Sequence, residues 1–194
     1  MDRESELALV GRLRAGDPGA FEAVYEAYRA RLFSFLVRLS RRRDVAEDLL
    51  EETWLRVVTS ARRLDPDTRL APWLFTVARN LYWSYCRSRL LEDELAAGLF
   101  DVWPVAPPPS PFEEAAASEL ERRIEQALAT LPARYREVLL LVANDEIGPA
   151  EAAAICGIRP EAMRQRLSRA RAMLAEALDV PVRRAALALG EVLT

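Results

Sequence analysis

The sequence predicts an all-α protein made of two small helical domains joined by a proline-rich linker. Apolar residues recur every three or four positions in two long blocks, as they do along the buried face of a helix. Between the blocks, residues 98–119 carry five of the 12 prolines, and proline at that density denies helical hydrogen bonds. Each block must therefore bury a core of its own.

We place the first domain at residues 1–95, the linker at 96–118, the second domain at 119–180 and a C-terminal tail of unassigned role at 181–194. The composition, with 51% hydrophobic residues, 29% charged residues and only 7 glycines, is typical of a globular, helix-rich chain. A net charge of -3 argues against a uniformly basic surface. Contact with nucleic acid would therefore need a local concentration of positive charge.

Several observations lower the expectation of catalysis. The chain has no His, which is the usual general base and the commonest metal ligand. Cys86 and Cys156 stand apart, with no CxxC pattern to suggest a metal site or a disulfide framework. We therefore expect no enzyme activity, no metal and no cofactor. The charged N-terminus does not resemble a signal peptide, and the run "VLLLVA" is too short to span a bilayer, so we expect a cytoplasmic protein without membrane insertion.

The first block contains three predicted helices. Asp17 and Pro18 form an N-cap and first-turn pair for the first of them. Asp44 and Glu47 match a capping box that would open the second, and Pro72 stands near the start of the third. The apolar stripe of the first helix is Phe21, Val24, Tyr25, Tyr28, Leu32, Leu36 and Leu39, and that of the third is Leu74, Val77, Ala78, Leu81 and Tyr85.

The second predicted helix presents acidic residues to solvent. Leu49, Thr53 and Val57 can face inward, which leaves an outer face of Glu47, Asp48, Glu51, Glu52 and Arg56. An acidic helix face is usually just solvated. Trp54 stands beside these carboxylates, however, and a large aromatic side chain next to exposed carboxylates is a plausible anchor for docking a protein partner.

The third predicted helix, "PWLFTVARNLYWSYCRSR", interleaves aromatic residues with arginines. Asn80, Trp83 and Arg87 fall on one face, where an amide, a ring and a cation would suit an unpaired nucleic-acid strand. Burial in the core is the alternative for Trp83, and both interpretations stay open. For Trp73 and Tyr85, burial is the expectation.

The second block predicts a helix-turn-helix. One helix spans about 120–131, and the next, "LPARYREVLLLVAND", should bury Tyr135, Val138, Leu139 and Val142. Gly148 and Pro149 then start a short helix, Gly157 ends it, and Pro160 starts a long one. The long helix and its approach carry Arg159, Arg164, Arg166, Arg169 and Arg171, opposite a buried stripe of Met163, Leu167, Ala170 and Leu174. A basic helix in this position is expected to enter the DNA major groove, although a solvated charged face is the simpler alternative.

Together these motifs resemble bacterial RNA polymerase sigma factors of the sigma-70 family, extracytoplasmic-function (ECF) group. "RDVAEDLLEETWLRV" is similar to the region-two helix that binds core polymerase, and "LDPDTRLAPWLFTVARNL" to the loop and helix that recognise and open the minus-ten element. "LPARYREVLLL" with "AAAICGIRPEAMRQRLSRAR" is similar to region four, which reads the minus-thirty-five element. The family usually has Ser where Gly148 starts the short helix.

The resemblance implies roles for individual residues and for partners. Core RNA polymerase would be bound by Asp48, Glu51, Glu52 and Trp54. The minus-ten non-template strand would be bound by Asp65, Arg69, Asn80, Trp83 and Arg87, and the minus-thirty-five duplex by Arg159, Arg164, Gln165, Arg166 and Arg169. An anti-sigma factor is a further implied partner.

The function expected from this resemblance is promoter-specific transcription initiation with core polymerase. The alternative is a helix-turn-helix regulator whose first domain is a helical sensor or dimerisation module. A sigma factor should need core polymerase for promoter specificity, whereas such a regulator should bind its operator unaided.

Overall fold

A computed structural model of the chain describes residues 2–96 and 119–192, and all its regular structure in these ranges is helical. The all-α prediction is confirmed. The expected linker, residues 96–118, lies outside the described residues except for Ala96. The helices are α1 (Arg3–Arg14), α2 (Pro18–Ser40), α3 (Arg43–Ser60), a 3-10 turn η1 (Ala61–Arg63), α4 (Leu70–Ala96), α6 (Glu119–Thr130), α7 (Ala133–Val142), α8 (Pro149–Ile155) and α9 (Pro160–Val192).

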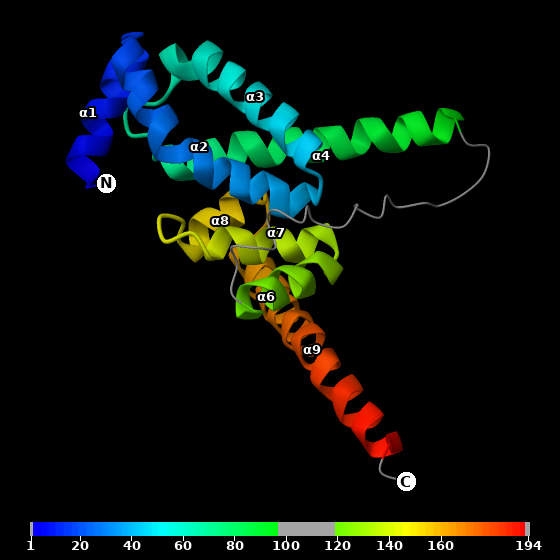
Figure 1. The fold of residues 1–194 in the computed structure, drawn as a ribbon. Helices are drawn as coiled ribbons and strands as arrows, with labels where there is room; N and C mark the ends of the chain where they lie inside the picture. Colours follow the sequence, from blue (N-terminus) through cyan, green and yellow to red (C-terminus); the bar gives the residue numbers. More distant parts are fainter. Residues whose placement is uncertain (1, 97–118, 193–194) are drawn as a thin grey trace.

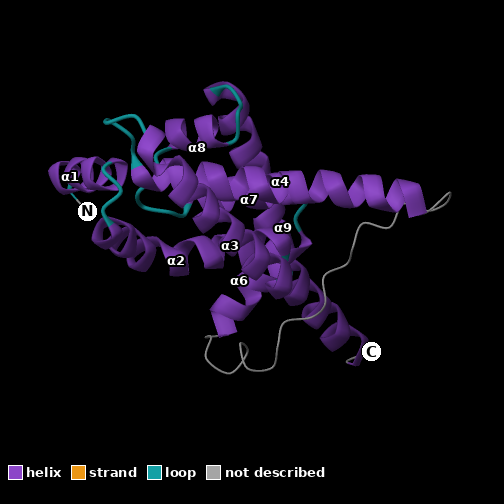
Figure 2. Cartoon of the chain, turned by 90° about the horizontal axis from the view of Figure 1, so that it is seen from above, coloured by secondary structure: helices purple, strands orange, loops and turns teal. Residues whose placement is uncertain are grey.

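The helices form two groups that lie against each other (Figure 1). In the first group, α2, α3 and α4 pack together and α1 lies against α2; in the second, α6, α7 and α8 pack around α9. Contacts of α7 with α2 and of α8 with α4 join the groups. Seen from above, α8 lies beside the first half of α4, and the second half of α4 extends away from it (Figure 2).

The core of the first group includes much of the apolar face predicted for α2, whereas on α4 three residues of the predicted stripe, Val77, Leu81 and Tyr85, are only half-buried. Leu32 and Leu36 of α2 and Leu74 of α4 are fully buried. The rings of Phe35 and Phe75 meet edge to face with their centroids 5.2 Å apart. These contacts fix α4 against α2 and so determine which face of α4 can meet a partner.

The helix starts agree with the sequence analysis at α2 but not at α3. Asp17 is the N-cap of α2, and its carboxylate accepts a hydrogen bond from the Gly19 amide at 2.9 Å. The capping box expected at α3 is wrong. Asp44 lies inside the first turn and pairs with Arg42, while Glu47 accepts a hydrogen bond from Arg43 at 2.9 Å. Because the helix already begins at Arg43, Asp44 lies inside the helix and cannot be its N-cap.

The start of α4 is held by a residue that the sequence analysis did not identify. The buried Glu6 of α1 accepts a hydrogen bond from the Leu70 amide at 2.8 Å. That amide belongs to the first turn of α4 and has no partner within its own helix. A side chain distant in sequence therefore caps the helix.

The second group contains the predicted helix-turn-helix, α8 and α9. Gly148 precedes α8, and its amide donates to the Glu151 carboxylate at 2.8 Å, which is the part of a capping box that needs no side chain at the N-cap. The side-chain acceptor that a serine would supply is missing here. Gly157 adopts φ +64°, the left-handed conformation that turns the chain out of α8 toward α9. Met163 and Ala170 of α9 are buried, as predicted.

The residues that α7 buries differ from those predicted. Val138 is fully buried, but Tyr135, Leu139 and Val142 are only half-buried. Arg136 and Glu137 are instead buried with Val138 and Leu141. These charged residues are covered because α7 packs against α2 of the first group as well as against α8 and α9, and side chains of α4 reach Glu137.

Candidate functional site

The basic face of α9 is exposed to solvent. Arg159, Arg164, Gln165 and Arg169 are exposed and Arg166 is half-buried. The Arg164 side chain is 72% exposed, and its guanidinium lies 3.3 Å from the Glu161 carboxylate in the first turn. The Gly157 turn positions this face at the start of the second helix of the pair, where a recognition helix presents side chains to base edges.

The acidic face of α3 is also exposed. Asp48 and Glu51 are exposed, and the half-buried Glu52 accepts a hydrogen bond from Arg56 at 2.9 Å. Thr53 is buried and donates its hydroxyl to the Leu49 carbonyl at 2.7 Å, so that it adds no unsatisfied polar group to the inner side. The predicted division of this helix into an acidic outer face and an apolar inner face is confirmed.

Trp54 does not lie on that outer face, and its burial argues against the expected role as a docking anchor. Its side chain is 8% exposed. The ring packs against α2, with centroids 5.9 Å from Phe21 and 4.9 Å from Tyr25. The indole nitrogen is buried without a hydrogen-bond partner in the described part of the chain. Trp54 therefore supports α3 from behind and does not project toward a partner.

Two exposed apolar side chains on α3 were not predicted to belong to this surface. Leu55 is 61% exposed and Val58 is 56% exposed. They follow Asp48 and Glu51 at helical spacing and so continue the same outer face. The helical spacing of Leu55 and Val58 from Asp48 and Glu51 could have indicated from the sequence that these apolar side chains lie on the acidic face.

On α4, the predicted DNA-facing residues differ in accessibility. Asn80 and Arg87 are exposed, whereas Trp83 is half-buried and packs against the core. The indole Nε1 of Trp83 donates a hydrogen bond of 2.8 Å to Oε1 of Glu137 on α7. The same oxygen accepts a hydrogen bond of 2.7 Å from Nε of Arg79. We call this arrangement of Arg79, Trp83 and Glu137 the α4–α7 contact.

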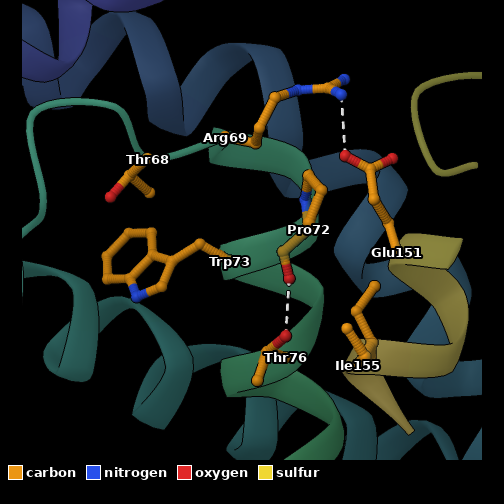
Figure 3. A pocket seen from close by; sticks show the side chains of 8 residues that line it. Thr68, Arg69, Pro72, Trp73, Thr76, Glu151 and Ile155 are labelled. Carbon is orange, nitrogen blue, oxygen red and sulfur yellow. Dashed lines mark hydrogen bonds and ion pairs between the residues drawn. The ribbon is translucent and has the colours of Figure 1, made fainter. Parts of the chain in front are cut away.

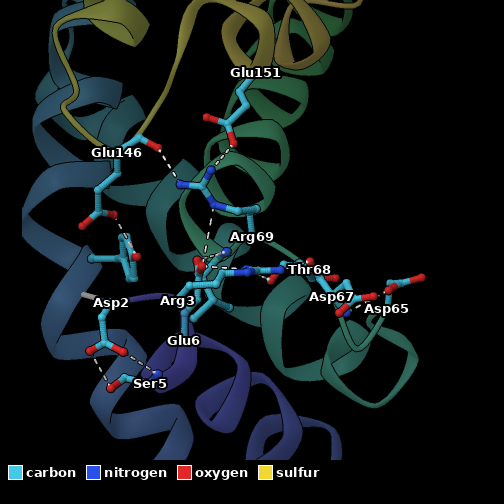
Figure 4. A network of polar contacts seen from close by, with 12 residues as sticks. Asp2, Arg3, Ser5, Glu6, Asp65, Asp67, Thr68, Arg69, Glu146 and Glu151 are labelled. Atoms are coloured by element: carbon cyan, nitrogen blue, oxygen red, sulfur yellow. Dashed lines mark hydrogen bonds and ion pairs between the residues drawn. The ribbon is translucent and has the colours of Figure 1, made fainter.

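The loop before α4 contributes Asp65 and Arg69. The Asp65 carboxylate accepts a hydrogen bond from the Asp67 amide at 2.9 Å and so shapes the turn. Arg69 reaches across to the second group, where it bonds the Glu151 carboxylate at 2.7 Å and the Glu146 carbonyl at 3.3 Å (Figure 4). Arg69 is thus already engaged with α8 and with the loop before it.

A small cavity of about 270 Å³ lies where the first turns of α4 meet α8. Figure 3 shows the side chains around it, with Arg69 bonded to Glu151. Its lining residues are Thr68, Arg69, Pro72, Trp73, Thr76, Glu151, Ala154 and Ile155. The half-buried Trp73 lies here and not in the centre of the core, where it was expected.

A second polar contact between the groups joins α2 to the loop after α7. The Tyr28 hydroxyl donates to the Glu146 carboxylate at 2.9 Å, and Arg31 lies 3.0 Å from the same carboxylate. Burial raises the pKa of Glu146, but the hydrogen bonds from Arg31 and Tyr28 outweigh this effect and lower it. Burial likewise raises the pKa of Tyr28 above its ordinary value, so Tyr28 stays a donor.

Comparison with known proteins agrees with this architecture. Residues 24–90 match the family described as Sigma-70 region 2, and residues 121–174 match Sigma-70, region 4. The RNA polymerase sigma factor CarQ of Myxococcus xanthus is 33% identical over 86% of this chain and 94% of its own length. The ECF RNA polymerase sigma factor EcfG of Rhodopseudomonas palustris is 36% identical over 77% of this chain and 80% of its own length.

Among solved structures, the sigma factor RpoE of Bartonella quintana, in complex with the anti-sigma factor NepR, is similar with a TM-score of 0.69. The two sequences are 31% identical, and the match covers 82% of this chain and 97% of that one. The fold and the paired region matches define a sigma factor that retains regions two and four. The chain belongs to the ECF group of the sigma-70 family, and it directs RNA polymerase to promoters to initiate transcription.

The part of the chain that the structure describes holds no helix with the length and apolar character needed to cross a membrane.

Proposed function

We propose that the chain performs this role through three separate surfaces: the outer face of α3 for core polymerase, the polar face of α4 for the minus-ten strand, and the basic face of α9 for the minus-thirty-five duplex. The observation that carries the proposal is the helix-turn-helix whose second helix presents exposed arginines, on a chain that also has an exposed acidic helix. Binding energy at these surfaces, without covalent chemistry by the protein, accounts for the whole activity.

The polymerase surface combines Asp48, Glu51 and Glu52 with the apolar side chains of Leu55 and Val58. Apolar side chains at the centre of an interface contribute most of its binding energy, and surrounding charges contribute orientation and association rate. The buried Trp54 holds α3 in place and is not itself an anchor.

The test of this surface is the double substitution Leu55→Ser with Val58→Ser, assayed for binding to purified core polymerase. Removal of two exposed apolar anchors should weaken binding by about 2 kcal/mol or more without unfolding the chain. Leu90→Ser is the matched control, because Leu90 is 52% exposed but lies on α4. Equal affinity of the double variant and the control would refute the assignment.

On α4, Asn80 is suited to hydrogen-bond a base edge, Trp83 to stack on a base and Arg87 to hold the backbone of an unpaired strand. Trp83→Ala should therefore reduce open complexes in a reconstituted holoenzyme, measured by permanganate footprinting of unpaired thymines. A template already mismatched across the minus-ten region should restore function. Normal footprints on a fully paired template would rule out this role.

On α9, Arg164 and Gln165 lie in the first turns, where base edges are within reach. An arginine contact to guanine contributes roughly 1–3 kcal/mol of discrimination between bases. Arg164→Ala should therefore relax the preference at particular upstream positions. A phosphate contact would instead weaken all sequences alike, and no change in either property would leave Arg164 a surface charge.

The experiment that tests the function as a whole is in vitro transcription with purified core polymerase on a library of genomic promoter fragments. The chain should initiate at a defined set of sites only when core is present. Specific binding of the same sites by the chain without core would favour an ordinary helix-turn-helix regulator.

From the same assignment we propose that the protein acts in the cytoplasm, with the polymerase, and that it is not an enzyme. The solved relative from Bartonella quintana is bound to the anti-sigma factor NepR. We propose that an anti-sigma factor also binds this chain, and co-purification from its source cells would test this proposal.

A further inference from the structure

Tyr135 lies at the start of α7, outside the helix-turn-helix, and arginines approach it from two helices. The guanidinium of Arg134, the preceding residue, lies 4.9 Å from the centre of the Tyr135 ring. Arg169 interacts with the Tyr135 hydroxyl from α9, the helix against which α7 packs. Both arginines are exposed and Tyr135 is half-buried, so the three side chains are accessible from solvent. We call Arg134, Tyr135 and Arg169 the α7–α9 cluster.

The α7–α9 cluster concentrates positive charge that no carboxylate balances. Among the side chains that the structure describes, neither Arg134 nor Arg169 forms an ion pair with a carboxylate. The nearby acidic residues have other partners, because Glu137 is held in the α4–α7 contact and Glu161 lies beside Arg164. Two guanidinium groups around one neutral hydroxyl repel each other, and a bound anion would offset this repulsion. The cluster therefore suits an anionic ligand.

The hydroxyl of Tyr135 is placed to donate a hydrogen bond to such a ligand. A guanidinium has donors only, so the arginines can bond the lone pairs of the phenol oxygen and leave its O–H available for an acceptor. The hydrogen bond from Arg169 lowers the pKa of Tyr135, and Arg134 acts in the same direction although burial opposes both. A more acidic hydroxyl is a better donor. Guanidinium and hydroxyl donors are the groups that commonly bind DNA phosphates.

The cluster lies beside the base-reading face of α9 and not on it. Arg169 follows Arg164 by five residues, which corresponds to about 140° around the helix axis and about 7.5 Å along it. When the first turns of a recognition helix meet base edges, a side chain rotated this far points toward the side of the groove, where the phosphates lie. Arg134 and Tyr135 continue this phosphate-facing surface onto α7.

We propose that Arg134 and Tyr135 of α7 form, together with Arg169 of α9, a binding site for a backbone phosphate of the minus-thirty-five duplex, outside the helix-turn-helix. This inference rests on the proposed binding of that duplex by α9. The contact carries no sequence information, because every base pair presents the same phosphate. Its role is to fix the register of α9 along the groove and so to support the base contacts of Arg164.

Arg134→Ala and Tyr135→Phe remove different parts of this site. Arg134→Ala removes one charge, so it should weaken promoter binding roughly three- to tenfold and reduce the slope of log K against log salt concentration by about 0.9. Tyr135→Phe keeps the ring and the net charge, so it should weaken binding by a similar factor, up to roughly tenfold, with the salt slope unchanged. Arg134→Lys keeps the charge and should keep the salt slope.

Arg29 and Tyr25 of α2 supply matched controls. The Arg29 guanidinium lies 5.8 Å from the centre of the Tyr25 ring, so the two residues repeat the arrangement of an arginine over a half-buried tyrosine. Unlike the arginines of the cluster, Arg29 has a carboxylate, that of Glu26, at 3.7 Å. Arg29→Ala and Tyr25→Phe remove the same charge and the same hydroxyl on a helix with no proposed DNA contact, and should change neither affinity nor salt slope.

The measurement is fluorescence anisotropy of the holoenzyme, reconstituted from purified core polymerase, with a labelled promoter duplex over a range of KCl concentrations. The duplex comes from a promoter mapped with the wild-type holoenzyme, and a second duplex differs only in a scrambled minus-thirty-five element. Circular dichroism and binding to core polymerase establish that each variant is folded. If Arg134→Ala is not folded, Arg134→Gln replaces it.

Weaker binding of both duplexes by the same factor, for Arg134→Ala and for Tyr135→Phe, with a reduced salt slope for Arg134→Ala alone, supports the proposal. Wild-type affinity of either variant overturns it, because the site needs both side chains. A loss that is larger for the promoter than for the scrambled duplex also overturns it, since the contact would then read bases.

Arg164→Ala and Arg169→Ala separate failure of this site from failure of the assignment on which it rests. If they weaken or alter promoter binding while Arg134→Ala and Tyr135→Phe behave as wild type, α9 binds the duplex and only the phosphate site is refuted. If they too bind both duplexes as the wild-type protein does, the minus-thirty-five assignment itself fails, and the proposal fails with it for that separate reason.

Discussion

Trp54 and Trp83 are the same residue type, and both were candidates for binding a partner, but their surroundings differ in kind. Trp54 lies between α2 and α3, within one helix group, and its neighbours are the rings of Phe21 and Tyr25. Trp83 lies between the two groups, and its indole N–H meets the carboxylate of Glu137. The apolar surroundings of Trp54 within one helix group indicate a structural role. The polar surroundings of Trp83 between the groups would allow its indole N–H to bond water or another partner in place of Glu137.

The comparison is best tested by substitutions that should act differently at the two sites. Trp54→Ala should have the largest effect on stability, because it leaves a cavity where a buried ring packs against Phe21 and Tyr25. We expect a loss of about 3–5 kcal/mol in the free energy of unfolding, measured by chemical denaturation. Trp54→Phe should retain much of the wild-type free energy of unfolding, because a phenylalanine ring fills most of the same space. A loss below 1 kcal/mol would mean that α3 does not need this ring for its position.

Trp83→Phe should have an intermediate effect. The substitution keeps an aromatic ring but removes the indole N–H, and a hydrogen bond to a charged group contributes about 1.5 kcal/mol at the lower end of its range. The Arg79 hydrogen bond to Glu137 remains and limits the loss. Chemical denaturation beside Trp54→Phe is the measurement, and equal losses for the two phenylalanine variants would remove the distinction between the sites.

Arg38→Ala should have the smallest effect of the three. Arg38 bonds Glu125 across the same boundary at 2.7 Å, but both side chains are exposed, and exposed ion pairs contribute roughly 0.2–1 kcal/mol. Thermal unfolding at low and high salt measures the contribution. If Arg38→Ala lowers the free energy of unfolding as much as Trp83→Phe does, the exposed ion pair contributes as much as the buried hydrogen bond to Glu137, and burial makes no difference between them.

Much of the fold could be predicted because its signals are local. Asp17 with Pro18 starts α2, and Gly157 with Pro160 separates α8 from α9, as their conformational preferences predict. The periodic apolar residues correctly indicated most of the buried face of α2, whereas on α9 Met163 and Ala170 are buried but Leu167 and Leu174 are only half-buried. The capping box at α3 failed because the helix already begins at Arg43, which leaves Asp44 inside it.

The parts that could not be predicted depend on contacts between distant segments. Nothing local distinguishes Glu137 from a solvated glutamate, since its burial requires α4 to lie against α7. Nor does the local sequence show that Arg69, in the loop before α4, pairs with Glu151, which is 82 residues away in the chain. Of the proposed DNA-binding residues, the sequence correctly placed Asn80, Trp83 and Arg87 on one helix, but only the assembled structure shows that Trp83 has an internal partner.

Because Glu6 caps α4, a truncated form of this protein needs α1 to keep the start of α4 in place. The region matched by the family begins at residue 24, after α1 has ended. A fragment starting there would lack the carboxylate that accepts from the Leu70 amide, and it would also lack Arg3, which donates to the carbonyl of Asp67 at 2.7 Å. The first turn of α4 and the loop before it would lose these hydrogen bonds to α1. We therefore expect a fragment that begins at residue 24 to be less stable than one that keeps the first helix.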